Sequence, residues 1–506
     1  MAKELMKDIV VLVPGITGSV LQKDGKDIWN PPYQVLLSAI GETLRVHSGL
    51  KDLTLQEDDI ERDYLDDGIK ATGLVQRASL VPGFFKLIDG YSYIRDQLTE
   101  NFAVTPGKVD EDKPANYFEF AYDWRRDNRV AARLLKKLID KKLRIWRERM
   151  NPHAKVILIA HSMGGLVSRY YVEHEGGCKD CKLLVTLGTP YRGSVKILDY
   201  LANGYLKNSW LIDRLAALTH WREVLRSFTS VYQLLPTYPV VNIDGNWQRI
   251  AEIDGIPGVV KERAIEGRKF LKCIELPKNA GAYTFTPIIG IGQKDTFQSA
   301  TFSNGLLKAS NKLPNQENEE SLLHPSYATG DDTVPLLSAI PKELSQTSQV
   351  SFIELHGSLQ SSDHLWENSL KPCLIASQNP LHLEEYFNNP QTIESAPQKS
   401  GISLSVDDLY LRDEEVTLGA EIINVKSDIL EETGNFGGLR AIITPVNVNG
   451  EQKTVVEYFD QKHDTQYKKI LEPNKLLPGL YRLEVDAKDV HESAPNALHS
   501  LFQVME

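Results

Sequence analysis

The stretch VILIAHSMGGLVSRYYVEH, residues 156–174, decides the fold class of this chain. Its first part has the length of a buried strand, its second part has the spacing of an amphipathic helix, and Ser162 lies at the apex of the turn between them. The small residues Ala160, Gly164 and Gly165 let strand and helix close into a strained turn that exposes the hydroxyl. An ordinary serine at a strand end is the alternative, but the whole pattern favours a nucleophile at Ser162.

Short apolar runs alternate with longer helical patterns on both sides of this stretch, from residue 1 to residue 386. Strands that are buried on both faces of a parallel sheet are apolar throughout, and repeated strand–helix units build such a sheet. The sequence therefore predicts an α/β domain over residues 1–386. Its expected strands are 9–13, 117–122, 156–160, 183–187, 287–291 and 350–355.

Two tracts in this domain, about 30–115 and 196–283, are too long to be simple connections. The second tract carries an apolar stripe at helical spacing. Such a stripe is typical either of packing against the core or of a lid that lines an acyl-chain site, and the pattern does not decide between them. The stripe consists of Leu211, Leu215, Leu218, Trp221, Leu225 and Phe228.

The composition changes at FNNPQTIESAPQKSG, residues 387–401, where Asn, Pro, Gln and Ser dominate in the manner of a linker. Beyond it, about seven short alternating segments are separated by turn signals. They predict an all-β sandwich over residues 402–506, and the immunoglobulin-like arrangement is the one that we expect.

Composition and charge exclude several classes of protein. Of 506 residues, 42 % are apolar and 25 % are charged, which is typical of a globular chain, and the formal charge of −11 argues against a nucleic-acid partner. A spanning helix needs about 18 or more apolar residues in succession, and the sequence has no such run. Residues 1–15 lack the pattern of a signal peptide, so we expect a cytoplasmic protein with free thiols and, at most, peripheral membrane contact.

A serine hydroxyl becomes a nucleophile when a histidine takes its proton and a carboxylate orients that histidine. In folds with a strand–Ser–helix turn, the acid follows the serine in the chain and the histidine comes last. The segment YATGDDTVP, residues 327–335, places Asp331 and Asp332 after a Gly-containing turn. We assign Asp331 as the acid, because the first Asp of the D-x-x-V pattern suits an inward-pointing carboxylate. Asp332 is the alternative acid, and a cap of the next turn is the other role open to it.

The histidine is expected after the apolar strand VSFIEL, residues 350–355. The segment SDHLW, residues 362–366, places His364 shortly after that strand, and we assign His364 as the base. His356 is the alternative. Its position at the strand terminus is more typical of a structural residue.

The tetrahedral oxyanion needs two backbone N–H donors. The residue after the nucleophile, Met163, supplies one, and Ile16 in the turn PGITGS supplies the other, because Gly15 and Gly18 allow the backbone to come close. The sequence contains no metal-binding cluster or nucleotide-binding loop, and this chemistry requires no cofactor.

Six motifs occur in the order IVVLVPGITGSVL, FAYDWRRD, AHSMGGLVSRYY, LVTLGTPYRGS, GDDTVP and SDHLW. Together they resemble the lecithin:cholesterol acyltransferase family, which includes lysosomal phospholipase A and phospholipid:diacylglycerol acyltransferase. The resemblance implies an α/β-hydrolase fold, a cap and a lid built from the two long tracts, and glycerolipid esters as acyl donors. It implies the same triad, Ser162, Asp331 and His364, and the same oxyanion donors, Ile16 and Met163.

The resemblance covers roughly residues 8–370 and departs from the family in two respects. Secreted and lysosomal members have a signal peptide and a disulfide in the first inserted tract, whereas residues 30–115 contain no cysteine, so an extracellular role is not expected. The sandwich at 402–506 lies outside the family pattern. The matching element Asp123, Trp124 and Arg125 is expected to be architectural.

We therefore predict a lipid acyl hydrolase that works through an acyl-serine intermediate on phospholipid or other glycerolipid esters. Hydrolysis is favoured because water needs no dedicated binding site. The alternatives are an O-acyltransferase with an alcohol acceptor, an esterase for soluble esters, and a non-catalytic binding module. Because a phospholipase endangers its own membrane, we expect the lid or the sandwich to restrain the enzyme or deliver it to a surface, and the sandwich to be a site for a protein partner.

Overall fold

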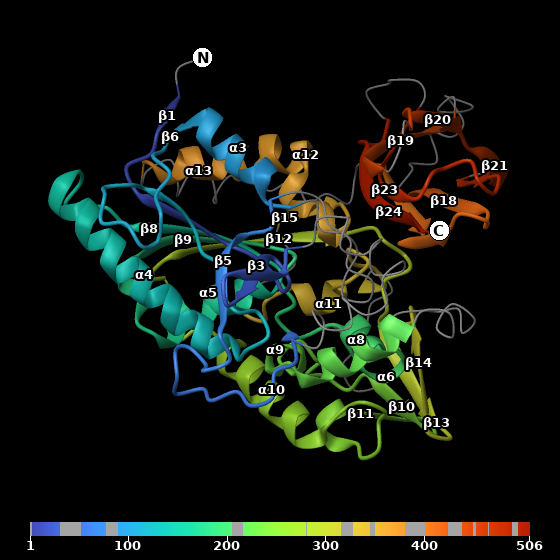
Figure 1. Ribbon diagram of the computed structural model, residues 1–506, viewed down its shortest axis with the longest axis horizontal. Coiled ribbons are helices and arrows are strands. Elements are labelled where there is room, and N and C mark those ends of the chain that lie inside the picture. The colour runs from blue at the N-terminus through green and yellow to red at the C-terminus, as the bar shows by residue number, and fades with distance from the viewer. Residues whose placement is uncertain are drawn as a thin grey trace.

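The computed structural model describes most of the chain. The described residues are 3–30, 52–76, 90–204, 216–279, 281–314, 327–344, 350–379, 400–423, 438–448, 452–463, 465–487 and 494–505. They form an α/β part followed by antiparallel β-sheets (Figure 1).

A six-stranded sheet forms the centre of the α/β part, and each neighbouring pair of its strands is parallel. All six predicted strands are present, and the α/β class is confirmed. Two of them end earlier than predicted, at Glu119 and Ile353. In spatial order the strands are β15 (Val350–Ile353), β12 (Thr284–Ile291), β9 (Cys181–Leu187), β8 (Val156–His161), β2 (Ile9–Val13) and β7 (Tyr117–Glu119).

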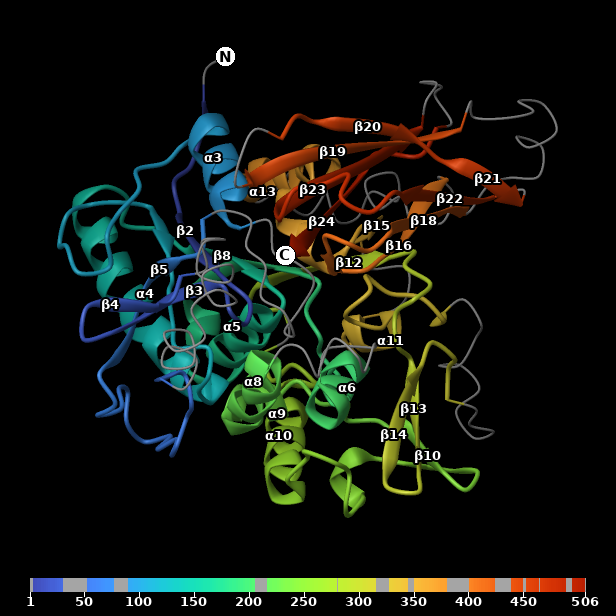
Figure 2. The ribbon, with the colours of Figure 1, turned by 45° about the vertical axis from the view of Figure 1, so that its right-hand side comes forward.

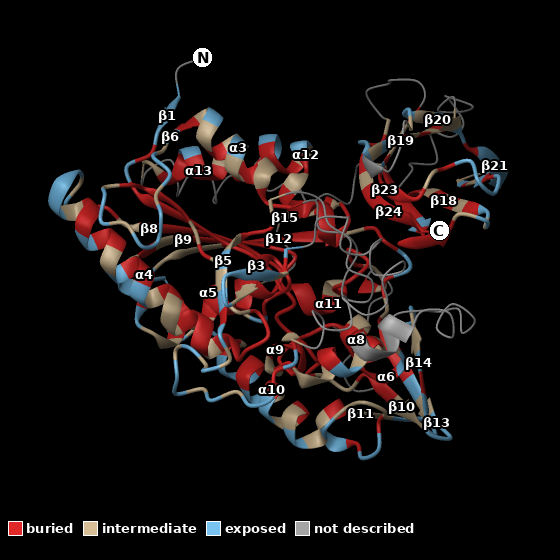
Figure 3. Ribbon diagram, viewed as in Figure 1, coloured by how far each residue is buried: buried red, intermediate tan, exposed pale blue. Residues whose placement is uncertain are grey.

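Strand β2 shows why the central strands are apolar at every position. Ile9, Val11 and Val13 pack into one hydrophobic core, and Val10 and Leu12 pack into another on the opposite face. Helices cover both faces, and the sheet between them is buried (Figures 1 and 3). The first core includes residues of α4 (Asn128–Arg149) and α5 (Met163–His174), and the second includes residues of α3 (Ser92–Asn101), α12 (Asp363–Leu365) and α13 (Lys371–Ser377).

Smaller sheets combine strands of the long tracts with strands that flank them, and most of the further helices lie in the second tract. One sheet consists of β4 (Lys26–Trp29), β3 (Ser19–Lys23) and β5 (Ile69–Leu74), and another of β11 (Asn246–Gln248), β10 (Val241–Ile243), β13 (Ser299–Ser303) and β14 (Leu306–Ser310). The short strands β1 (Glu4–Leu5) and β6 (Phe102–Ala103) also pair. The further helices are α6 (Val195–Asn203), α8 (Ala216–Ser227), α9 (Thr229–Tyr232), α10 (Lys261–Ile274) and α11 (Leu336–Ala339), with short turns η1 (Gly177–Lys179), η2 (Ile250–Glu252) and η6 (Trp366–Leu370).

The predicted apolar stripe is described only at its C-terminal end. Leu225 and Phe228 are buried in the core, whereas Leu211 and Leu215 lie outside the described residues. The choice between a lid and ordinary core packing therefore stays a prediction.

The Asp123–Trp124–Arg125 element is held in the interior. The Arg125 guanidinium is buried and pairs with Asp123 at 2.6 Å and with Asp67 at 2.9 Å. Trp124 donates its indole N–H to the carbonyl oxygen of Ser19 at 3.0 Å. These contacts join segments far apart in the sequence, as an architectural element does.

Two β-sheets with a shared hydrophobic core begin at Gly401. Every pair in them is antiparallel except β17 with β24. The prediction of an all-β part is confirmed, and the immunoglobulin-like arrangement stays a prediction. The exact domain boundaries also stay predictions, since residues 387–399 of the expected linker lie outside the described residues. In spatial order the strands are β16 (Gly401–Val406), β18 (Val416–Ile423), β22 (Gln466–Leu471) and β21 (Asp460–His463), then β17 (Leu409–Leu411), β24 (Leu498–Met505), β23 (Gly479–Ala487), β19 (Leu439–Val448) and β20 (Val455–Tyr458).

The C-terminal sheets lie against the end of the central sheet that carries β12 and β15 (Figure 2). The side chain of Gln293, just after β12, bonds the backbone of Ile402 and Leu404 at 3.3 and 3.0 Å. Leu355, just after β15, is part of the core of the C-terminal sheets, and Ser358 donates to the carbonyl oxygen of His499 at 3.0 Å. The segment after β15 is therefore shared between the two parts.

Within the described ranges, no helix has the length and apolar character that crossing a bilayer requires. The four cysteines, at 178, 181, 273 and 373, are free thiols, as predicted.

Candidate active site

Ser162 occupies a strained turn between β8 and α5. Its φ of 53° and ψ of −125° are unusual for a residue with a side chain, and its backbone N–H donates to the carbonyl oxygen of Leu187 at 2.8 Å. The first residues of α5 pass close to the end of the neighbouring strand β2, because a Cβ on Gly164 would lie 2.4 Å from the carbonyl oxygen of Pro14. The predicted strand–Ser–helix turn is therefore present.

The Ser162 hydroxyl faces a histidine that is paired with a carboxylate. Ser162 Oγ lies 2.9 Å from His356 Nε2, and His356 Nδ1 lies 2.7 Å from Asp331 Oδ2. Since a carboxylate only accepts hydrogen bonds, Nδ1 carries the proton toward Asp331, and Nε2 accepts from the serine. All three residues are buried, with exposed fractions of 4 % or less.

Asp331 is oriented by its own loop. Its Oδ1 accepts the backbone N–H groups of Thr333 at 3.0 Å and Val334 at 2.7 Å, which leaves Oδ2 for the imidazole. The backbone N–H of His356 also donates to the carbonyl oxygen of Asp331 at 2.9 Å. Acid and histidine are thus joined through both side chain and backbone.

A glycine leaves room for this pair at the end of β9. Gly188 has a φ of +58°, and a Cβ there would lie 3.0 Å from His356 Nδ1 and 3.1 Å from Asp331 Oδ2. A side chain at this position would therefore be strained in its backbone and would crowd the pair.

Asp332 points elsewhere. Its Oδ2 lies 3.0 Å from Lys196 Nζ in a largely buried ion pair, and its backbone N–H donates to Thr296 Oγ1 at 2.8 Å. Of the two neighbouring aspartates, the structure brings Asp331 to the histidine and Asp332 to the lysine.

The prediction of His364 as the base does not hold. His364 lies on the short helix α12, where its Nδ1 is bonded to the Asn368 side chain at 3.0 Å and its ring packs edge-on against Phe352 at 5.4 Å. The structure instead places His356, for which the sequence favours a structural role, between Ser162 and Asp331.

The sequence favours His364 because it predicts that the last central strand extends to residue 355. Strand β15 ends at Ile353, so His356 lies beyond it, at the start of the turn η5 (His356–Ser361), which carries the chain away before His364. In open α/β sheets, functional groups gather directly at the carboxyl ends of the parallel strands. Proximity to the strand end was therefore the signal that favoured His356.

Of the two residues predicted as oxyanion donors, Met163 directly follows the serine in the chain, and Ile16 belongs to a turn that contacts it. Met163 is the first residue of α5, where backbone N–H groups have no partner within the helix. Ile16 lies in a turn that is closed by Gly18 N–H donating to the Gly15 carbonyl oxygen at 3.1 Å. This turn contacts the elbow, because a Cβ on Gly15 would be 2.9 Å from Ser162 Cβ.

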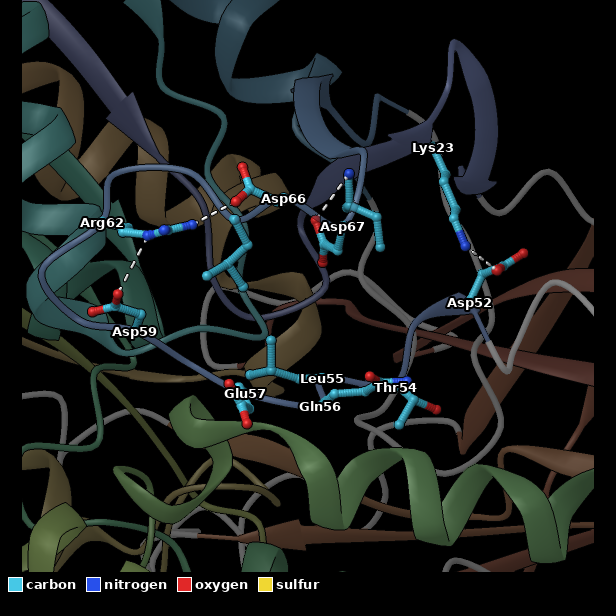
Figure 4. A pocket seen from close by; sticks show the side chains of 12 residues that line it. Lys23, Asp52, Thr54, Leu55, Gln56, Glu57, Asp59, Arg62, Asp66 and Asp67 are labelled. Atoms are coloured by element: carbon cyan, nitrogen blue, oxygen red, sulfur yellow. Dashed lines mark hydrogen bonds and ion pairs between the residues drawn. The ribbon is translucent and has the colours of Figure 1, made fainter.

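A hollow of about 640 Å³ lies away from these residues, between the β3 region and residues 52–69. Its lining is mostly charged: Lys23 pairs with Asp52 at 2.5 Å, and Arg62 lies between Asp59 and Asp66 (Figure 4). A smaller hollow, of about 280 Å³, is lined mainly by residues of the α9–α10 region and its neighbours. Ser162, Asp331 and His356 line neither hollow, and the charged lining of the larger one does not suit an acyl chain.

Among the described side chains, no group of three or more His, Cys, Asp or Glu residues is arranged to hold a metal ion. The functional groups that the site brings together are a hydroxyl, an imidazole, a carboxylate and backbone donors.

The family model described as lecithin:cholesterol acyltransferase matches residues 96–265, a range that includes Ser162 and Met163. The resemblance in the sequence motifs is confirmed over that range. It supports an esterase or acyltransferase that acts on lipid acyl groups. No curated protein matches the chain.

Two forms of one lipase are among the solved structures that match the chain. The mature form of the Bacillus licheniformis lipase BlEst2 is 14 % identical to this chain, with a TM-score of 0.29. The match covers 72 % of this chain and 91 % of the lipase chain. The propeptide form of the same lipase is 12 % identical, also with a TM-score of 0.29. This match covers 98 % of this chain and 92 % of the lipase chain.

Proposed function

We propose that this protein is a serine-dependent lipid acyl hydrolase in which Ser162 is the nucleophile, His356 the general base and Asp331 the orienting acid. The observation that carries the proposal is the hydrogen-bonded series from Asp331 Oδ2 to His356 Nδ1 and from His356 Nε2 to Ser162 Oγ, at 2.7 and 2.9 Å. A strained turn that presents the serine supports it.

The reaction has two halves. In the first, His356 Nε2 takes the Ser162 proton while Oγ attacks the ester carbonyl carbon, and Asp331 stabilises the imidazolium that forms. The carbonyl oxygen becomes an oxyanion that the backbone N–H groups of Met163 and Ile16 bind. When the intermediate collapses, the C–O bond to the alcohol breaks, and His356 returns the proton to the departing alkoxide.

In the second half, His356 takes a proton from water, and the resulting hydroxide attacks the acyl-serine. Collapse of the second tetrahedral intermediate breaks the bond to Ser162 Oγ, which recovers its proton from His356, and a fatty acid leaves. The match to an acyltransferase family supports a second candidate, in which a lipid alcohol takes the place of water in this half and an ester leaves instead.

Labelling with a fluorophosphonate probe tests the assignment of the triad, because the probe reacts with an activated serine. We expect the wild-type protein to be labelled and Ser162→Ala not to be. His356→Gln should lower the rate of ester cleavage by about 10³-fold or more, since the base is lost. His364→Asn is the matched control and should stay within about twofold of the wild type.

Loss of activity in His364→Asn together with normal activity in His356→Gln would contradict the assignment. Absence of labelling in the wild type would favour a non-catalytic binding module.

Product analysis on phospholipid vesicles that contain a long-chain alcohol tests the acceptor. Free fatty acid as the main product, absent with Ser162→Ala, supports hydrolysis. An ester of the added alcohol as the main product would assign the protein as an acyltransferase. Peripheral contact with a membrane, a cytoplasmic location and a protein partner for the C-terminal sheets stay predictions.

A further inference from the structure

A second series of buried hydrogen bonds runs behind the triad. Gly15 N–H donates to Tyr91 Oη at 2.8 Å, Tyr91 Oη lies 3.0 Å from His161 Nδ1, and His161 Nε2 lies 3.1 Å from the carbonyl oxygen of His356. Tyr91 and His161 have exposed fractions of 0 % and 1 %. The mechanism proposed above does not use either side chain.

The partners fix the direction of each hydrogen bond. The carbonyl oxygen of His356 can only accept, so His161 Nε2 must carry a proton and donate it. Tyr91 Oη accepts the Gly15 N–H and has one proton of its own, which it donates to the unprotonated Nδ1 of His161. His161 is thus a neutral imidazole with one donor and one acceptor, both satisfied.

The surroundings of His161 favour this neutral state. Burial, together with the nearby His356 imidazole, lowers the pKa of His161 to about 3. Burial also raises the pKa of Tyr91, so that its phenol keeps its proton. Near neutral pH, therefore, His161 stays neutral and Tyr91 stays protonated, and the two side chains keep this hydrogen-bonding pattern.

The two ends of this series are parts of the proposed catalytic machinery. One end, Gly15, immediately precedes Ile16 and lies against the Ser162 side chain. The other end is the backbone of His356. The turn and the histidine belong to chain segments more than 300 residues apart in the sequence, and Ser162 lies between them.

We propose that Tyr91 and His161 are positioning residues that brace the Gly15–Ile16 turn against the His356 backbone, so that the oxyanion donor and the base keep a fixed spacing around Ser162. This inference rests on the proposed function. Neither side chain touches the reacting atoms. A misplacement of about 1 Å in an active site can lower a rate by about 100-fold.

The variant Tyr91→Phe tests the brace, because it removes the hydroxyl and both of its hydrogen bonds but keeps the ring. Tyr93→Phe is the matched control: it removes a hydroxyl from the same region of α3, where Tyr93 donates to the exposed Asp363. We expect kcat for a simple ester to fall by about tenfold to 100-fold in Tyr91→Phe with KM within about twofold of the wild type. Tyr93→Phe should leave kcat and KM within about twofold.

Two substitutions at His161 separate the two ends of the brace. His161→Gln can place an amide N–H near the position of Nε2 and keep the donor to His356, and His161→Asn can place an amide oxygen near Nδ1 and keep the acceptor for Tyr91. Both should retain more activity than His161→Ala. A boronic acid that forms a tetrahedral adduct with Ser162 should bind more weakly to each variant in proportion to its loss of kcat/KM.

A role limited to stability would give a different result. If Tyr91→Phe lowers the melting temperature but leaves kcat and boronic acid affinity within twofold of Tyr93→Phe, the inference is wrong and the proposed function stands. If the wild-type protein neither cleaves esters nor reacts with a fluorophosphonate, the proposed function fails, and the inference fails with it.

Discussion

Glu354 is a buried carboxyl two residues before His356, with an exposed fraction of 5 %. Burial raises the pKa of Glu354 to about 7. Hydrogen bonds with the Ser362 side chain and with the Leu355 backbone N–H oppose this shift. Between the ordinary pKa of 4.5 and the folded value, the unfolded chain loses the proton while the folded protein keeps it. The free energy of unfolding should therefore fall as the pH rises through this window.

Glu354→Gln removes this dependence, because the amide has a similar shape and does not ionise. We expect the stability of the variant relative to the wild type to be about 2 to 3 kcal/mol more favourable at pH 8 than at pH 5. Urea unfolding at the two pH values measures it, with the exposed Glu148→Gln as the control. An equal pH dependence in the wild type and Glu354→Gln would contradict the expectation.

At the scale of residues, the sequence singled out Ser162 and Asp331, which the structure brings to one histidine, but it proposed His364 where the structure places His356. The serine is marked by its neighbours, because the turn needs small residues at fixed positions. The histidine has no comparable local signature. The path of the backbone after β15 decides which of His356 and His364 reaches the serine, and the sequence predicts the end of that strand two residues too late. Nothing in the local pattern of His161 or Tyr91 indicates that they join distant segments.

At the scale of elements, the turn from β8 into α5 depends on two glycines with different neighbours. A Cβ on Gly165 would lie 1.9 Å from Thr189 Oγ1, a side-chain atom, whereas a Cβ on Gly164 would meet the backbone carbonyl oxygens of Pro14 and Val13 at 2.4 and 2.6 Å. Overpacking of this kind typically costs about 1 to 3 kcal/mol. A substitution at Thr189 can shorten the side chain that a Cβ on Gly165 would meet. No substitution removes the backbone carbonyl groups that a Cβ on Gly164 would meet.

We therefore expect Gly165→Ala and Gly164→Ala each to lower the melting temperature and the rate of ester cleavage. Adding Thr189→Ala should recover part of the loss in Gly165→Ala, with a coupling of about 1 kcal/mol in a double-mutant cycle, and none of the loss in Gly164→Ala. Thr189→Ala alone controls for the hydrogen bond from Thr189 Oγ1 to the Ser162 carbonyl oxygen at 3.0 Å. Equal recovery in both backgrounds would contradict the explanation.

The elements of the central sheet could be predicted because their chemistry is local. A strand such as Ile9–Val13, buried on both faces, must be apolar at every position, and its sequence shows this directly. The contacts that join the parts of the chain are not local. Leu355 was expected to end a strand of the central sheet, but it packs in the core of the C-terminal sheets, a partnership that no pattern around residue 355 reveals.

At the scale of the whole molecule, the contacts of Leu355 and Ser358 with the C-terminal sheets predict what removal of those sheets does. A chain that ends at residue 386 loses the apolar surroundings of Leu355 and the acceptor of Ser358, so His356 should lose its fixed place. We expect at least a tenfold lower turnover of a small soluble ester, together with a lower melting temperature.

The substrate distinguishes this result from the other roles expected for the C-terminal sheets. Loss of activity on vesicles with full activity on the soluble ester would indicate delivery to a surface. A higher activity on both substrates would indicate restraint of the enzyme and would contradict support of His356.

The Ser358–His499 contact joins a residue near His356 to the last strand that the ribosome makes. Ser162, Asp331 and His356 are all synthesised before β24, the strand that supplies the His499 carbonyl oxygen. We therefore expect the growing polypeptide to stay inert toward lipid until that strand has emerged and docked, which would protect the membranes around it during translation.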